Sequence, residues 1–272
     1  VVDGGWIVYN LGVIDFAGGT AVHINAGAAG LALAIILGKR FGFSKGINQP
    51  HNVPLTLLGV ALLWFGWFGF NAGSEVAADG IASLAFVNTL AAPVGGMLSW
   101  ALYERIAHGK STAVGAGSGV IAGAVAITPA CAYLDPIWAL ALGLVVGVAC
   151  AMAIEMKFHF GFDDSLDVVG VHLVGGIWGS LSIGFFGTSV VNSIGLDGLL
   201  YGGGSDLLVK QALAVGLVAS YSFIATLIIG YAIEKTIGFR VSREVEIEGI
   251  DLKEHAESAY ELASSSRGGA SL

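Results

Sequence analysis

Seven long stretches of this chain contain no aspartate, glutamate, lysine or arginine. They cover residues 16–38, 52–74, 80–103, 111–134, 136–154, 168–196 and 211–233. Each is close to or above the ~20 residues that an α-helix needs to cross a bilayer. Membrane-spanning strands would alternate apolar and polar residues over about ten positions, and these stretches do not alternate. The sequence therefore predicts an all-α membrane protein with seven transmembrane helices.

Composition agrees with a membrane protein and excludes several other classes. Of the 272 residues, 55% are hydrophobic and 12% are charged, whereas about a quarter of the residues of a soluble domain are charged. The net charge of −8 argues against a nucleic-acid partner. Cys131 and Cys150 lie within apolar stretches and are interpreted as small buried side chains. No nucleophile elbow, phosphate loop or metal-ligand spacing is present, so we expect no enzymatic activity, cofactor or metal.

The basic residues indicate how the chain is threaded, because lysine and arginine favour cytoplasmic loops. If the first helix enters from outside, Lys210 alone lies on the outer side. The inner side then holds Lys39, Arg40, Lys45, Arg105, Lys110, Lys157, Lys235, Arg240, Arg243, Lys253 and Arg267. We therefore expect the C-terminus to be cytoplasmic in a multi-pass protein of the cell membrane.

The composition changes after Ile233, where the chain becomes polar and mostly acidic. Residues 1–237 are predicted to form the transmembrane domain and residues 238–272 a cytoplasmic tail. A solvated, partly disordered terminus is one interpretation of this tail. Alternation of apolar and charged residues in VEIEGIDL, and a possible short helix in EHAESAYEL, leave a docked regulatory tail equally open.

Two stretches of the sequence repeat a short pattern around a histidine. The first has Asp15, then His23, with glycines four and seven residues later; the second has Asp167, then His172, with glycines at the same offsets. The threading runs the two helices in opposite directions, as in the inverted repeats that transporters use to build a site near the bilayer midplane. Small residues one turn apart let such helices approach closely.

The histidines are candidate site residues because an ionisable group at membrane depth is rare unless it faces a cavity, a partner or a pathway. For each histidine taken by itself, the alternative is a purely structural neutral imidazole that is hydrogen-bonded to a backbone carbonyl. Two neutral imidazoles can also bond to each other, one donating and one accepting. Asp15 and Asp167 stand where a carboxylate would cap a helix start, so we expect them to have structural roles.

Aromatic residues crowd the outer end of the second predicted helix, in LLWFGWFGFNAGS. An aromatic belt at the lipid interface accounts for most of them. At the end of the run, a cation-binding interpretation is open, since an aromatic face attracts ammonium-type cations and the Ser74 hydroxyl can accept a hydrogen bond.

Taken together, these motifs resemble those of the ammonium transporters, the Amt, Mep and Rh proteins. The resemblance rests on DFAGGTAVHINAGAAGL, GWFGFNAGS, AFVNT, ITPACAY, DVVGVHLVGGIWGSL and GFRVSREVEIEGIDLKEHAESAY, spread over nearly the whole chain. It implies transport of ammonium or ammonia through a hydrophobic pore, in a homotrimer with one pore per subunit. Many members are blocked by a PII-type signalling protein at the cytoplasmic face.

The resemblance also implies roles for single residues. His23 and His172 would be the paired histidines of the pore, with Trp67 lining the pore beside them. Phe70 would be one of two stacked phenylalanines at the outer mouth, and Ser74 would accept a hydrogen bond from recruited ammonium. Asp15 would be the family's largely structural aspartate.

The chain departs from the family pattern at its beginning. Members have eleven helices in two inverted halves plus a last one, and this chain begins at the equivalent of the fifth, so it resembles a member that lacks roughly the first four. Two alternatives to a working transporter follow: an inactive fragment, because half a pore leaves polar groups facing lipid, and an ammonium sensor that signals through its tail.

Overall fold

The computed structural model of the chain describes residues 5–43 and 50–258. Within these ranges the chain is helical and contains no strand. The elements are α1 (Trp6–Leu11), η1 (Gly19–Ile24), α2 (Asn25–Leu37), α3 (Val53–Gly73), α4 (Gly80–Ala107), α5 (Ala113–Ile127), α6 (Pro136–Phe160), η3 (Val169–Leu173), α7 (Val174–Phe186), η4 (Leu199–Tyr201), α8 (Asp206–Thr236), α9 (Arg243–Glu248) and α10 (Ile250–His255). The predicted all-α fold is confirmed.

Six of the described helices are long and apolar enough to cross a membrane. Two of these spans are composite, because η1 runs directly into α2 and η3 into α7. The remaining predicted span, 111–134, is a shorter apolar helix, since α5 ends at Ile127. Pro129 follows closely, and a proline ring cannot continue a helix.

Residues 128–134, which follow α5, form a buried loop rather than the end of a helix. Backbone groups at membrane depth need hydrogen-bond partners from the protein. The side-chain amide of Asn88, on α4, donates to the carbonyls of Cys131 and Leu134, at 2.8 Å each. The loop also accepts from the segment before η1, through Phe16 N to Pro129 O at 3.0 Å. These bonds let a non-helical segment lie inside the protein.

Helix starts follow the local sequence. Asn52, Asp79 and Asp135 precede α3, α4 and α6, and the side chain of each accepts hydrogen bonds from backbone amides of the first turn. α3 and α6 also carry a proline in their first two positions, where its missing N–H is not needed.

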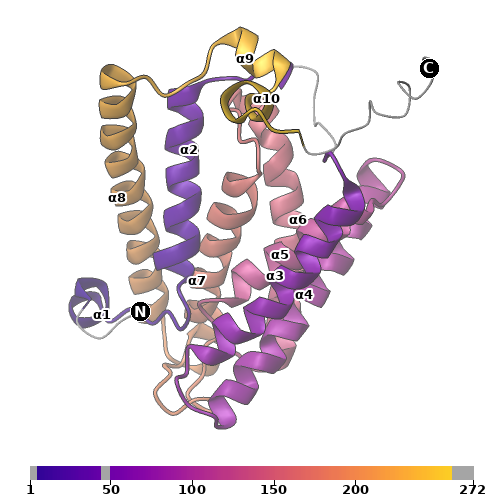
Figure 1. Cartoon of the computed structure of the whole chain (residues 1–272). Coiled ribbons are helices and arrows are strands. Elements are labelled where there is room, and N and C mark those ends of the chain that lie inside the picture. Colours follow the sequence, from indigo (N-terminus) through magenta and orange to yellow (C-terminus); the bar gives the residue numbers. More distant parts are fainter. Residues whose placement is uncertain (1–4, 44–49, 259–272) are drawn as a thin grey trace, which may run out of the picture.

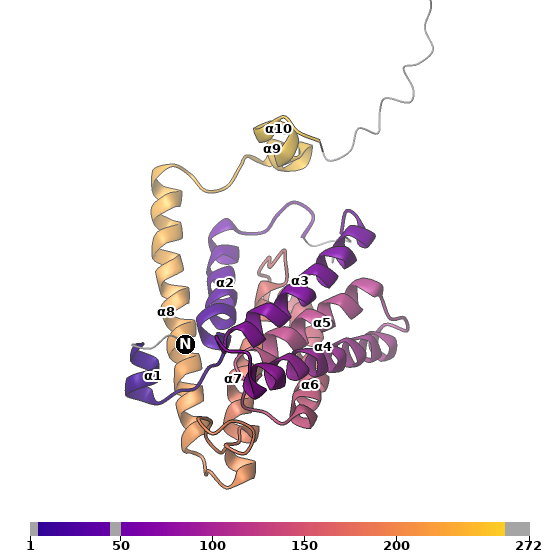
Figure 2. The same cartoon turned by 60° about the horizontal axis from the view of Figure 1, so that its bottom comes forward.

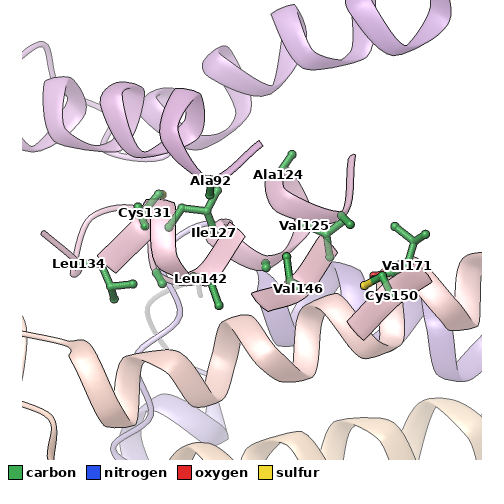
Figure 3. Close-up of a cluster of buried hydrophobic side chains, with 14 of the residues drawn as sticks. Ala92, Ala124, Val125, Ile127, Cys131, Leu134, Leu142, Val146, Cys150 and Val171 are labelled. Carbon is green, nitrogen blue, oxygen red and sulfur yellow. The ribbon is translucent and has the colours of Figure 1, made fainter. Parts of the chain in front are cut away.

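The protein has two groups of helices with the histidine-bearing spans between them. α2 and α8 lie side by side in both views, α4, α5 and α6 form a separate bundle, and α7 stands between (Figures 1 and 2). Small residues let the bundle pack closely: a Cβ added to Gly143 on α6 would overlap the carbonyl oxygen of Ala92 on α4. The buried cluster around Ala92, Ile127 and Leu142 fills this bundle (Figure 3).

The two histidine-bearing spans cross in opposite directions at very close range. A Cβ added to Gly27 would lie 2.5 Å from Leu173, and one added to Gly176 would lie 3.0 Å from Ile24. Each glycine is four residues after its histidine, and each contacted residue directly follows the other histidine. The crossing is therefore symmetric about the two histidines, as an inverted repeat requires.

The close crossing predicts that Gly27 tolerates no larger side chain. Gly27→Val would drive a side chain into the backbone of Leu173, so we expect a loss of about 3 kcal/mol of unfolding free energy, the upper end of what over-packing costs. Thermal unfolding in detergent measures the loss. Gly216→Val on α8, where nothing lies within 4 Å of an added Cβ, is the matched control. Equal losses in the two variants would contradict the prediction.

Candidate functional site

His23 and His172 meet at the crossing of the two spans. His23 lies on η1 and His172 on η3, and both of these short elements are π-helical turns. Such turns are rare and occur frequently at functional sites. The Nδ1 atoms of the two imidazoles are 3.1 Å apart. At this distance one neutral ring donates and the other accepts, so the structure brings the two predicted site histidines into one pair.

A carboxylate sits at the start of each π-helical turn. Asp15 accepts from the amides of Gly18, Gly19 and Thr20 at 2.7–3.0 Å, and from the Thr20 hydroxyl at 2.5 Å. Asp164 accepts from the amides of two residues, at 3.0 Å from Val168 and 2.7 Å from Val169. Ionised acceptors give strong hydrogen bonds to free backbone amides at a helix start. The two turns are thus fixed by equivalent groups.

Asp167 has a different role from the one its position suggests. Its carboxylate pairs with the ammonium of Lys157 on α6, and its backbone has φ of +59°. The cap at this turn is Asp164, which stands eight residues before His172, as Asp15 stands eight residues before His23. The repeated spacing of eight is the signal that sequence reasoning missed.

Trp67 completes the buried part of the site. Its indole stacks on the His23 imidazole, with ring centroids 5.4 Å apart and 24° between the planes. The indole N–H donates to the Thr128 hydroxyl at 2.9 Å, in the loop after α5. His23 is also buried, and its Nε2 atom has no hydrogen-bond partner among the described residues. Thr128 is a second residue that the sequence did not single out.

Phe70 and Ser74 lie at the end of α3, on the outer side in the predicted threading. Phe70 is 43% exposed and meets Trp67 edge-on, at 6.3 Å between ring centroids. The Ser74 hydroxyl donates to the Phe70 carbonyl at 2.7 Å. Because its hydrogen is used there, the Ser74 oxygen keeps its lone pairs for an outside donor. Phe70 and Ser74 thus form the exposed edge of the site, next to the buried imidazoles and Trp67.

The other histidines of the described chain stand apart from this pair. His51 lies just before α3, His108 follows α4 and bonds Glu155 at 2.7 Å, His159 lies in the last turn of α6, and His255 ends α10. No group of three potential metal ligands occurs among the described residues.

The tail contacts the C-terminal end of α2 and the residues that follow it. Arg240 donates to the carbonyls of Leu37 and Lys39 at 2.8 Å each and pairs with Glu246 at 2.6 Å. Glu246 accepts from the amide of Phe41. Hydrogen bonds from Arg240 and then from this amide lower the pKa of the Glu246 carboxyl. The VEIEGIDL segment lies within helices α9 and α10 (Figure 1).

The tail also borders a cavity of about 520 Å³ between the C-terminal half of α2 and the loop before η3. Leu33 and Leu37 of α2, Val168 before η3, and Phe239 and Ile250 of the tail are among its lining residues. Lys45, Arg267 and the end of the EHAESAYEL segment lie outside the described residues.

Comparison with known proteins gives a family for the chain. The model of the Ammonium Transporter Family matches residues 1–260. An ammonium transporter of Mycobacterium tuberculosis is 53% identical over 265 residues, which are 96% of this chain and 56% of the relative. Ammonium transporter Amt1 of Archaeoglobus fulgidus is 46% identical, over 94% of this chain and 64% of the relative. The chain spans little more than half the length of its mycobacterial relative.

Solved structures agree with this result. Mep2 of Candida albicans superposes with a TM-score of 0.83 at 35% identity, over 89% of this chain and 55% of that protein. A protein described as a sensor Amt protein superposes with a TM-score of 0.82 at 33% identity, over 94% of this chain and 62% of that protein. The chain has part of the fold of a transporter family rather than an enzyme family, and it belongs to the ammonium transporter family.

Proposed function

We propose that this chain forms the histidine-bearing half of a pore that conducts ammonium or ammonia across the cell membrane. The observation that carries the proposal is the pair of buried imidazoles, 3.1 Å apart, on the two crossing spans. The ammonium transporters among its relatives support the choice of substrate.

The chemistry of the pair suits ammonia better than ammonium. A charged group is costly at membrane depth, and the surrounding helices are apolar. Ammonia is neutral and both donates and accepts hydrogen bonds, so it matches a neutral imidazole pair that offers one nitrogen without a partner, His23 Nε2. In this mechanism ammonium transfers its proton to solvent water at the exposed edge of the site, and neutral ammonia goes on to the pair.

The outer edge of the site suits the charged form. Phe70 offers an aromatic face and Ser74 offers an oxygen acceptor, next to each other at the end of α3. Ammonium would bind there through a cation–π contact and one hydrogen bond. Trp67 then separates this exposed position from the buried imidazoles. Asp15 acts indirectly, by holding η1.

We further propose that residues 1–237 form the membrane domain and residues 238–272 a cytoplasmic regulatory tail. The bonds of Arg240 to the Leu37 carbonyl and of Glu246 to the Phe41 amide support a docked tail. The family resemblance suggests a homotrimer and a PII-type protein that binds the cytoplasmic face.

Two alternatives have specific support. The chain covers 56% of a relative's length and leaves Phe70 exposed, which favours a fragment that is inactive alone. The likeness to a sensor Amt protein favours an ammonium sensor. Deletion of residues 242–272 separates the sensor from a regulated transporter: a sensor keeps ammonium binding but loses signalling, whereas a regulated transporter loses only its control.

Replacing either histidine of the pair should reduce transport. We expect His23→Ala and His172→Ala each to lower ammonium-evoked flux about tenfold, the factor for one lost hydrogen bond of about 1.4 kcal/mol in the rate-limiting complex. The assay uses proteoliposomes with this chain alone, and with this chain joined to the first part of the Mycobacterium tuberculosis relative.

His159→Ala is the matched control for the histidine variants, because His159 lies at the far end of α6 and should leave flux unchanged. Unchanged flux in both pair variants, in protein that still folds, would rule out the role of the pair. Flux from the joined protein only would identify the chain as a fragment of the working pore.

Loss of Arg240 should release the tail. Arg240→Gln removes the bonds to the Leu37 and Lys39 carbonyls, so we expect proteinase K to cut residues 238–258 several-fold faster.

Acidification should also release the tail from the end of α2 and speed the same cleavage. Folding lowers the pKa of Glu246, so its contribution to docking is present above the ordinary glutamate pKa and is lost as the pH falls through the lowered one.

Lys253→Gln is the control for the tail, because Lys253 pairs with Glu248 inside the tail and makes no ion pair with the membrane helices among the described residues. If both variants are cut at the rate of the unchanged chain, the tail is not held by Arg240.

A further inference from the structure

One buried charge in the described chain has no part in the proposed pore. Lys157, in the last turn of α6, is 4% exposed, although its position among the inner-side cations suggests a solvated loop residue. Burying an ammonium group costs free energy unless it is paired and hydrogen-bonded. Its contacts therefore indicate what this lysine does.

Lys157 holds a strained loop. Its ammonium donates to the Asp164 carbonyl at 2.9 Å and pairs with the Asp167 carboxylate. Asp167 has φ of +59°, a left-handed conformation that aspartate adopts more often than most residues but less readily than glycine. Such strain persists only when the surroundings fix it, and it clusters at functional sites. Here the fixing group is the Lys157 ammonium.

The held loop carries the cap of the second π-helical turn. The Asp164 carboxylate accepts from the amides of Val168 and Val169, where η3 begins, and His172 follows on that turn. α6 also packs directly on η3, since a Cβ added to Gly170 would lie 2.6 Å from Ile154. A continuous set of contacts thus runs from Lys157 through Asp164 to His172.

We infer that Lys157 is a positioning residue for His172: through Asp164 it sets the π-helical turn, and with it the separation of the two imidazoles. It touches neither imidazole. The part of this inference that concerns flux rests on the proposed function, whereas the part that concerns imidazole geometry does not.

The two repeats differ in this respect. The loop that carries Asp15 is held by neutral groups: Phe16 and Ala17 donate to the carbonyls of Pro129 and Thr128, and Gln211 donates to the Ile14 carbonyl at 2.8 Å. Among the described residues, the hydrogen bonds and the ion pair of the Lys157 ammonium go to Asp164 and Asp167 and not to that loop. Loss of Lys157 should therefore move the turn of His172 and leave the turn of His23 in place.

The primary test measures the imidazole pair directly. The chain is labelled with ¹⁵N-histidine, reconstituted in liposomes and studied by solid-state NMR; His23→Gln and His172→Gln samples assign the Nδ1 signals of the pair. We expect Lys157→Met, which removes the charge and keeps the apolar stem, to abolish the correlation across the Nδ1–Nδ1 hydrogen bond. Flux should fall roughly tenfold or more, in line with the losses from small misplacements.

A second substitution separates positioning from general stability. Glycine adopts φ of +59° without strain, so Asp167→Gly in the Lys157→Met background should restore much of the Nδ1–Nδ1 correlation. Asp163→Asn is the control, because Asp163 lies in the same loop but pairs with Arg40 at 3.1 Å, and no hydrogen bond or ion pair joins its side chain to η3 among the described residues. It should leave the correlation unchanged.

Each outcome decides the inference. Loss of the correlation in Lys157→Met, with recovery on Asp167→Gly, supports it. An unchanged correlation in folded Lys157→Met protein overturns it, as does equal loss in Asp163→Asn. If Lys157→Met does not fold, Asp164→Ala tests the next step, because it removes the acceptor of the Val168 and Val169 amides and leaves the carbonyl that Lys157 bonds; an intact correlation there overturns the inference. An absence of flux in every sample, with these spectra as expected, rejects the proposed pore but not the positioning role.

Discussion

The close contact between the two crossing spans is the constraint on which the rest of the structure depends. Two imidazoles share a hydrogen bond only when their helices approach within contact of each other's backbone, and Gly27 and Gly176 permit that approach. Hydrophobic burial does not draw helices together in lipid, so such a contact needs close packing and satisfied polar groups. The aspartate caps fix the turns that carry the histidines. Trp67 stacks on His23 and bonds the loop after α5, so these groups provide hydrogen-bond partners around the crossing.

Hydropathy predicted the spans well, because about twenty consecutive apolar residues without a charge are rare in a folded chain outside membrane helices. It predicted the end of α5 poorly. Residues 128–134 are as apolar as a helix, and only Pro129 and the distant amide of Asn88 show that they form a loop. A pattern along the chain does not reveal a hydrogen-bond partner from another helix.

The residues of the candidate site could be predicted where an unusual side chain stood within a recognisable sequence motif. The two histidines, Trp67 and Asp15 were identified from residue type and motif; the structure brings the histidines and Trp67 together and places Asp15 at the start of η1. Asp164 was missed in favour of Asp167 because three aspartates lie within five residues, and composition does not tell which one faces the turn. The choice depends on a left-handed backbone at Asp167, which a non-glycine residue seldom adopts.

The loop after α5 has a consequence for how the protein tolerates change. A helix satisfies its own backbone, so an added residue at its end displaces little else. The 128–134 loop instead takes its partners from three other parts of the chain: Trp67 of α3, Asn88 of α4 and Phe16 before η1. One inserted residue there would put all three partners out of register together, so this short irregular segment, although it lies outside every helix, has little freedom in length.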